Sequence, residues 1–346
     1  MKRIMIVANA SSTHTIRWAN ALYEKGHAIT LVTQHTPIAG LKKEIRIINL
    51  PYNGMKGYFL NTLEVRRISS EFKPDIIHAY FASGYGTLLA NTQLNYYVSV
   101  WGSDVYIYPN KNFINKFLLK RSLRKASYIF STSEAMKSET LKYTSKPIYV
   151  IPFGVEVEKY DRERVPSSQL TIGAAKVLDD IYGIDVLIKA FSKVNKSSKR
   201  DVRLKIAGDG PNRAALEKLA NELGISEYVE FLGWLDFDYI SEFYKSLDIF
   251  CVPSYSESFG VVAVEAGAAS LPTVVSNVGG LPEVVRDNET GFVVQAGDVE
   301  AFASKLMSLV NNDGIRETLG KAARKRIESN YQWKSNVDDM SKYYEN

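Results

Sequence analysis

The sequence of 346 residues has a single cysteine, Cys251. One thiol cannot form an internal disulfide, and it cannot supply the clustered thiolates of a cysteine-based metal site. The near absence of cysteine makes the cytosol the expected compartment. No apolar run approaches the roughly 18 residues that a membrane-spanning helix needs. The start, MKRIMIVANASST, has too short an apolar run for a signal peptide, and we expect a first strand there.

Acidic residues are scarce in the first part of the chain. Residues 1–150 carry 20 lysines and arginines against 8 aspartates and glutamates, a net charge of +12. The remaining residues carry 23 against 30, a net charge of −7. This asymmetry indicates that the first half meets something anionic. A nucleic acid, an acidic lipid and a phosphorylated substrate would all fit the charge.

Short runs rich in β-branched residues alternate with helical patterns along the whole chain. Several of these runs are continuous in valine and isoleucine, as expected for strands buried on both faces of a parallel sheet. The strand candidates are RIMIVAN, AITLVTQ, IRIINL, DIIHAY, YYVSVWG, YIFSTS and IYVIPFG, then LTIGAAK, RLKIAGDG, VEFLGW, DIFCVPS, PTVVSN and GFVVQ. Alternation this regular predicts a doubly wound α/β fold.

The alternation pauses once, at the polar segment 154–168, where Pro166 and two serines predict a linker. We therefore expect one Rossmann-like domain over 1–153 and a second over 169–328. Such domains are expected to face each other across a cleft at the carboxyl ends of their strands. A helix predicted over 329–346, with aromatic residues along it, can pack back on the first domain.

The most informative segment is SESFGVVAVEAGAAS, residues 256–270, in which only small and apolar side chains separate Glu257 from Glu265. A helix from about Phe259 would place Glu265 roughly 12 Å along its axis from Glu257. The helix start offers backbone N–H groups and a positive dipole end to phosphate. An elongated ligand fits, with a polar head at Glu257, phosphates between, and a ribose diol at Glu265. The alternative is a helix-start charge at Glu257 and a surface residue at Glu265, but a packed apolar helix makes an unpaired carboxylate costly.

The longer segment PSYSESFGVVAVEAGAASLPTVVSNVGGLPEVV resembles the nucleotide-sugar signature of retaining family-4 glycosyltransferases, the glycosyl transferases group 1, which have the GT-B fold. Further segments occur in the family's order, namely NALYEKGHAITLVT, VSVWGSDVY, VIPFGVEVEKY, YGIDVLIKAF and IAGDGPNRAALEKLA. The resemblance implies transfer of a sugar from a UDP- or GDP-linked donor to a hydroxyl, with retained anomeric configuration. The acceptor class it implies is a polysaccharide, a glycolipid or a lipid-linked saccharide, and neither a metal, another cofactor nor a nucleic acid is expected.

The same resemblance assigns roles to residues of the second domain, which would bind the donor. Glu257 would touch the donor sugar hydroxyls and assist the reacting centre, and Glu265 would bind the ribose. The diphosphate or sugar would be held by backbone N–H groups of Ser258, Phe259, Gly260 and Val261.

Two departures from the family pattern bear on the chemistry. The family's arginine position falls on Ala174 or Ala175, and its lysine position on Tyr182. Lys176 is the nearest cation, so we assign it the catalytic task of stabilising the leaving diphosphate. In the first domain, Trp101 stands where the family often has a histidine that reaches the donor sugar, which puts that contact in doubt.

Weaker signals give further donor-side candidates. The tight loop with Gly208 and Gly210 follows a strand and would pass near the nucleotide, although it lacks the third glycine of a dinucleotide fingerprint. Backbone atoms around Trp234 and Leu235 could face the base. Asp236 and Asp238 spell the D-x-D of metal-dependent transferases, but we expect them to cap the following helix.

The first domain would receive the acceptor. Its first turn, ANASSTHTIRWAN, lacks the family's glycine pair and offers hydroxyls instead. The acceptor candidates are Thr13, His14, His78, Ser103 and Asp104, and for Asp104 a helix-capping role is an equal alternative.

The segment KNFINKFLLKRSLRK, residues 111–125, predicts a basic amphipathic helix able to lie on an anionic membrane. An ordinary helix with its apolar face in the core is the competing interpretation. The expected location is thus the cytoplasm, with the inner face of the cell membrane as one possible site. A nucleotide-sugar epimerase of the same fold and a binding-only module remain alternative functions, whereas a dehydrogenase is disfavoured because ANASST provides no glycine fingerprint.

Overall fold

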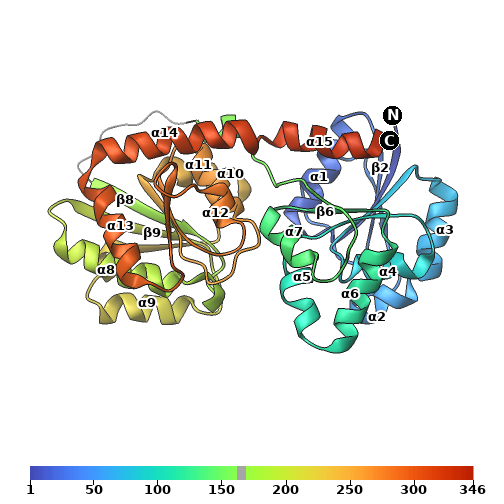
Figure 1. The fold of residues 1–346 in the computed structure, drawn as a ribbon, viewed down its shortest axis with the longest axis horizontal. Coiled ribbons are helices and arrows are strands. Elements are labelled where there is room, and N and C mark those ends of the chain that lie inside the picture. The colour runs from blue at the N-terminus through green and yellow to red at the C-terminus, as the bar shows by residue number, and fades with distance from the viewer. Residues whose placement is uncertain (162–168, 346) are drawn as a thin grey trace. The chain divides into compact units, whose positions relative to one another are not determined.

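The computed structural model describes residues 1–161 and 169–345, which form two compact units. Unit 1 comprises Met1–Pro152 and Ser335–Asn346, and unit 2 comprises Phe153–Lys334. Of the linker predicted at 154–168, residues 162–168 lie outside the described residues. Figure 1 shows a sheet flanked by helices in each unit.

Unit 1 is built on a parallel sheet, which within the described residues has seven strands in the order β3-β2-β1-β4-β5-β6-β7. The strands are β1 (Arg3–Val7), β2 (Ala28–Thr33), β3 (Arg46–Asn49), β4 (Ile76–Tyr80), β5 (Tyr97–Ser99), β6 (Tyr128–Ser131) and β7 (Ile148–Val150). Central strands such as β4 are buried at every position, because helices cover both faces of the sheet.

The helical segments of unit 1 connect these strands. They are α1 (Thr13–Glu24), α2 (Gly54–Leu60), α3 (Thr62–Phe72), α4 (Tyr85–Thr92), α5 (Ser103–Tyr106), the 3₁₀ turn η1 (Tyr108–Asn110), α6 (Phe113–Lys125) and α7 (Glu134–Thr140). None of the described helices of the chain is long and apolar enough to cross a bilayer.

Unit 2 repeats the architecture with a sheet of six strands among the described residues, in the order β10-β9-β8-β11-β12-β13. The strands are β8 (Gln169–Ala175), β9 (Asp201–Ala207), β10 (Val229–Gly233), β11 (Ile249–Val252), β12 (Thr273–Ser276) and β13 (Gly291–Val294). The helical segments are η2 (Val157–Tyr160), η3 (Asp180–Tyr182), α8 (Ile184–Ser197), α9 (Arg213–Glu222), η4 (Ser226–Tyr228), α10 (Phe237–Lys245), α11 (Val261–Ala268), α12 (Leu281–Val284), α13 (Val299–Asn311) and α14 (Asp313–Asn330). The predicted doubly wound α/β fold is confirmed in both units.

The last helix, α15 (Trp333–Glu345), starts in unit 2 and belongs to unit 1 from Ser335 onward. Within unit 1 its aromatic residues pack on the sheet. The Tyr344 hydroxyl lies 2.5 Å from His78 Nδ1, and the Tyr343 ring centroid lies 4.8 Å from that of Tyr149.

In both sheets the strand order reverses direction once, between β1 and β4 in unit 1 and between β8 and β11 in unit 2. Connections leave the two central strands toward opposite sides at such a point, so a crevice opens at their carboxyl ends. The residues that follow β1, β4, β8 and β11 are therefore the first places to look for a site.

Candidate functional site

Two charged side chains meet at the reversal point of unit 2. Strands β8 and β11 are neighbours, with Ile249 opposite Ile172. Lys176 directly follows β8, and Glu257 lies in the loop after β11. The Lys176 Nζ is 2.6 Å from Glu257 Oε2, and the two side chains are only 16% and 11% exposed. The structure thus joins the two residues that the sequence interpretation had marked as catalytic.

The oxygen that faces the lysine is closed to solvent. Glu257 Oε2 makes no hydrogen bond among the described residues, but the Lys176 ammonium group lies 2.6 Å from it. A buried carboxylate oxygen normally has a polar partner, and the ammonium group is that partner here.

Tyr182 stands where the sequence comparison with the resembled family expects a lysine. Its ring contacts Lys176. The Lys176 Nζ lies 4.6 Å from the centroid of the Tyr182 ring. A cation over an aromatic face is attracted by the ring quadrupole. Tyr182 and Glu257 together hold the ammonium group at the end of β8, a contact that the sequence did not predict.

Glycines allow the loops that carry this pair to approach neighbouring backbone closely. A Cβ on Gly208, whose φ is +126°, would lie 1.8 Å from the carbonyl oxygen of Lys176. A Cβ on Gly279, whose φ is +51°, would lie 1.5 Å from the carbonyl oxygen of Glu257. Only glycine fits either position. Gly208 and Gly210 therefore lie beside Lys176 as supports of its loop, since Gly210 similarly abuts the Leu178 backbone.

Helix α11 begins directly after the Glu257 loop. Gly260 is its N-cap, and the N–H groups of Ala263 and Val264 donate to the Gly260 carbonyl at 2.9 and 3.2 Å. The Val261 N–H precedes these bonds at the positive end of the helix dipole. The Phe259 side chain is buried, with its ring centroid 5.8 Å from that of Tyr331, and this packing fixes where the helix starts.

Glu265 is half-buried on α11 and has a partner that the sequence did not reveal. The Tyr244 hydroxyl donates to Glu265 Oε2 at 2.8 Å. Burial, reinforced by the neighbouring carboxylate, raises the pKa of Tyr244 well above its ordinary value, so the phenol remains a donor. Sequence periodicity placed Tyr244 on a helix but contained no signal that connects it with Glu265, 21 positions later.

The other donor-side candidates lie at the edge strand. Trp234 follows β10 and is 71% exposed. Leu235 is next to it and half-buried. Asp236 takes the N-cap position of α10, but its side chain makes no capping hydrogen bond, and the side chain of Asp238 lies outside the described part of the structure. Among the described residues, no group of three or more histidine, cysteine, aspartate or glutamate side chains is placed to hold a metal ion.

In unit 1 two acceptor candidates need correction. His78 is completely buried on β4, bonded to Tyr344 and to Ser99 Oγ at 2.9 Å, and burial lowers its pKa to about 3. Asp104 is also completely buried and accepts backbone N–H groups from Ala82, Trp101 and Gly102. Both side chains are structural, because no surface of either is left for a ligand. Asp104 is the second residue of α5, whose N-cap is Gly102, so it ties the loops after β4 and β5 together rather than serving as the N-cap residue that the alternative expected.

The remaining acceptor candidates lie at the carboxyl ends of the strands. Thr13 and Ser103 are exposed at the first positions of α1 and α5. The His14 ring centroid lies 6.1 Å from that of Trp101, in an edge-to-face arrangement. His14 thus adjoins the aromatic residue that replaces the family's histidine.

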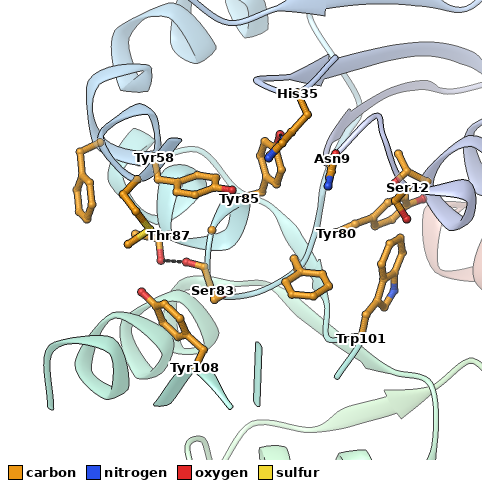
Figure 2. A pocket seen from close by; sticks show the side chains of 15 residues that line it. Asn9, Ser12, His35, Tyr58, Tyr80, Ser83, Tyr85, Thr87, Trp101 and Tyr108 are labelled. Atoms are coloured by element: carbon orange, nitrogen blue, oxygen red, sulfur yellow. Dashed lines mark hydrogen bonds between the residues drawn. The ribbon is translucent and has the colours of Figure 1, made fainter. Parts of the chain in front are cut away.

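A pocket of about 390 Å³ lies at this edge of unit 1 (Figure 2). Its lining comes from the end of β4 and from the segments that follow β1, β2, β3, β4 and β5, including helix α2 after β3. The walls include seven aromatic rings, Tyr58, Phe59, Tyr80, Phe81, Tyr85, Trp101 and Tyr108. Asn9, Ser12, Ser83 and Thr87 add polar atoms. Trp101 lines this pocket, as does Ser12 of the first turn, whereas the five acceptor candidates are not among its lining residues.

Tyr85 organises the pocket from α4. Its hydroxyl lies 2.7 Å from His35 Nδ1 and 3.2 Å from Thr33 Oγ1, and it accepts the Gln34 N–H at 3.1 Å. Burial lowers the pKa of His35, which favours a neutral ring. Sequence analysis missed Tyr85 and His35, because they are 50 residues apart and neither stands in a motif.

Comparisons with known proteins agree with this arrangement. A family model described as "Glycosyl transferases group 1" matches residues 158–326, and one described as "Glycosyl transferase 4-like" matches residues 3–133. The two matches cover most of both units. The chain belongs to the GT-B glycosyltransferases of the family-4 type.

Individual proteins show the same likeness. An uncharacterized glycosyltransferase of Methanocaldococcus jannaschii is 28% identical over 312 residues, which span 88% of this chain and 85% of the relative. The solved sucrose-phosphate synthase of Thermosynechococcus elongatus superposes with a TM-score of 0.85 at 20% identity, over 100% of this chain and 98% of that one. Anabaena HepE, solved with UDP and glucose, gives a TM-score of 0.81 at 16% identity, with 99% of each chain covered.

Proposed function

We propose that this glycosyltransferase takes its sugar from a nucleoside diphosphate sugar, UDP- or GDP-linked, and transfers it with retained configuration and without a metal ion. The observation that carries the proposal is the mostly shielded Lys176–Glu257 pair at the reversal point of unit 2, next to the start of α11. HepE, which shares the fold, was solved with UDP and glucose. That likeness is consistent with a nucleotide-sugar donor for this chain.

The reaction breaks the bond between the anomeric carbon and the diphosphate oxygen and forms one to an acceptor hydroxyl oxygen. Negative charge develops on the leaving diphosphate, where Lys176 and the positive end of α11 stabilise it. The proton of the acceptor hydroxyl passes to a phosphate oxygen. Attack then occurs on the face that the diphosphate leaves, which retains the anomeric configuration.

Glu257 orients the donor sugar in this proposal. Lys176 fixes its Oε2, so the carboxylate is held in one orientation to accept a hydrogen bond from a sugar hydroxyl. Glu265, oriented by Tyr244, accepts the ribose hydroxyls.

Unit 1 supplies the acceptor site. Its pocket presents aromatic faces and a few polar atoms, a lining suited to a saccharide or an amphipathic acceptor. Polysaccharide or glycolipid assembly, at the inner face of the cell membrane, is the setting we propose for the reaction.

A thermal-shift screen of nucleoside diphosphates and their sugars tests the donor proposal. The cognate nucleotide should raise the melting temperature of the wild type, and Glu265→Gln should lower its affinity roughly tenfold through loss of charge-assisted hydrogen bonds. The matched control is Glu283→Gln, since the backbone carbonyl of residue 283, which accepts from Tyr331 and Arg326, is kept in that variant. No shift from any nucleotide at millimolar concentration would overturn the proposal.

The cognate donor and acceptor then test the retained configuration and the independence of metal. The anomeric configuration of the product, followed by proton NMR, should match that of the donor. Turnover should be unchanged in EDTA. Conversion of the donor to an epimer without acceptor would instead identify an epimerase.

A further inference from the structure

An unusual set of apolar side chains is exposed at one end of unit 1. Helix α2 and the start of α3 expose Met55, Phe59, Leu60 and Leu63, the last being 75% accessible. The first turns of α6 expose Phe113, Ile114 and Phe117, with Phe113 81% accessible. A soluble protein rarely exposes so many large apolar residues together without a partner for them. We refer to these seven residues as the apolar patch.

The two parts of the patch are neighbours. Asn91 on α4 donates to the Tyr58 carbonyl of α2 at 3.5 Å and accepts from Arg121 of α6 at 2.5 Å. Helices α2 and α6 therefore flank the same residue of α4, and Figure 1 shows them at the same end of the unit. The pocket is adjacent, because Met55 and Phe59 line it as well as belonging to the patch.

Helix α6 has two different faces. Leu119, Ser122 and Leu123 are buried, which confirms a core-facing side. Phe113 and Phe117 lie on the opposite side, and at helical spacing Lys120 and Arg124 continue the same face. The exposed face is thus aromatic in its first turns and cationic in its last turns.

The charge around the α6 part of the patch is of one sign. Residues 105–133 contain six lysines and arginines and no aspartate or glutamate. On α6, Lys116, Lys120, Arg124 and Lys125 are exposed. On α3 the nearest acidic residue, Glu64, is already bonded to Arg67. A surface that is both apolar and basic complements a bilayer of anionic lipids, whose interface has a negative potential above an apolar interior.

We infer that unit 1 docks on an anionic lipid bilayer through the apolar patch, with the cations of α6 contacting the lipid headgroups. A protein partner with an acidic rim, or a second copy of this chain, is a rival occupant. A second copy fits less well, because two copies of the patch would bring their cations together. If the proposed function also holds, the adjacent pocket can receive an acceptor carried by a lipid.

Sedimentation with lipid vesicles tests the inference. The full-length protein should bind vesicles containing about a third phosphatidylglycerol more tightly than pure phosphatidylcholine, and high salt should weaken the binding. The variant Phe113→Ser/Phe117→Ser should reduce partitioning at least about tenfold. The variant Lys116→Gln/Lys120→Gln/Arg124→Gln should reduce vesicle partitioning about a hundredfold, because each cation near an anionic surface contributes roughly fivefold.

The control is Lys142→Gln combined with Leu141→Ser, which removes an exposed cation and an exposed apolar residue of the same unit away from the patch. It should bind vesicles like the wild type. Unchanged melting temperatures verify that all three variants fold. Equal binding by the patch and control variants, or absence of vesicle binding by the wild type, overturns the inference. In that case, a dimer in light scattering that Phe117→Ser dissociates identifies a second copy as the occupant.

Nucleotide binding separates this inference from the proposed function. The patch variants should retain the thermal shift with the cognate nucleotide, because Lys176, Glu257 and Glu265 belong to unit 2. If the wild type binds vesicles but no nucleotide shifts its melting temperature, the docking inference stands and the donor proposal fails. If a nucleotide shifts the melting temperature but vesicles do not bind, the donor proposal stands and the docking inference fails.

Discussion

Unit 1 and unit 2 each contain a parallel sheet whose strand order reverses once. The residues at the two reversal points differ in kind. In unit 2 the strand ends bring together a lysine and a glutamate that are mostly shielded from solvent. In unit 1 the corresponding edge carries a pocket walled by aromatic rings. The comparison teaches that one fold can serve two binding tasks, because its loops can vary while the sheet stays the same. Under the proposed function, the charged pair serves the diphosphate and the aromatic faces serve the acceptor.

The largest expected effect is on turnover, through unit 2. Glu257→Gln should lower kcat by roughly 10²–10³, the range found when one preorganised electrostatic contact to a reacting centre is removed. The affinity for the nucleoside diphosphate should change less than about threefold, since the contact is to the sugar. Steady-state kinetics and calorimetric titration measure the two quantities. Turnover at the wild-type level would remove Glu257 from the reaction.

The second effect concerns the stability of unit 2. Lys176→Met and Glu257→Gln should each lower the free energy of unfolding by roughly 2 kcal/mol, because each leaves a mostly buried polar partner uncompensated. The double variant should lose less than the sum of the two, which shows coupling. Urea unfolding of the four proteins completes this cycle. Strict additivity would mean that the two side chains do not interact in solution.

A third prediction contrasts one tryptophan in each unit. Trp101→Ala should raise the acceptor KM about tenfold and leave nucleotide affinity unchanged, since its ring forms a pocket wall in unit 1. Trp234→Ala, in the exposed loop after β10, should show the reverse pattern. Kinetics at varied donor and acceptor concentrations separate the two effects. If both variants alter the same constant, the assignment of one ligand to each unit is wrong.

The smallest effect is a pH dependence located in unit 1. The pKa of His78 is lowered by burial to about 3, whereas an unfolded histidine titrates near 6.5. The unfolded chain therefore binds the proton first, and stability falls as the pH drops below about 6.5. From pH 7.5 to 5.5 this histidine should contribute a loss of about 1.4 kcal/mol.

His78→Gln should flatten that part of the stability profile, measured by urea unfolding at each pH. His27 and His35, whose pKa values are also lowered mainly by burial, should contribute in the same direction. An unchanged slope in the His78 variant would assign the loss to those two residues.

The sequence predicted the fold because it is encoded locally: runs rich in β-branched residues mark the strands, and several are continuous in valine and isoleucine. Lys176 and Glu257 were singled out through the family resemblance, and their ion pair was not predicted. The Tyr244–Glu265 bond and the Tyr182–Lys176 contact were not predicted, because they depend on how helices and loops pack. His78 was placed wrongly for a related reason, since the sequence did not show that α15 would cover it.

The aromatic pocket was the largest omission. Its walls come from six separate segments between Asn9 and Tyr108, of which only the one from Tyr80 to Thr87 contributes more than three residues. Such a lining has no spacing that a sequence could reveal. Trp101 was noticed only as a departure from the family pattern, and its role as a wall became visible in the structure.

The most direct test of the central claim is calorimetric titration of the cognate nucleoside diphosphate into three proteins. Lys305 is the matched control for Lys176, because its Nζ lies 4.5 Å from the Phe292 ring centroid, a similar cation–aromatic contact elsewhere in unit 2. We predict that Lys176→Met weakens binding at least about tenfold, from loss of a charge-assisted contact to phosphate, while Lys305→Met binds like the wild type. Equal affinities in all three proteins would contradict the account.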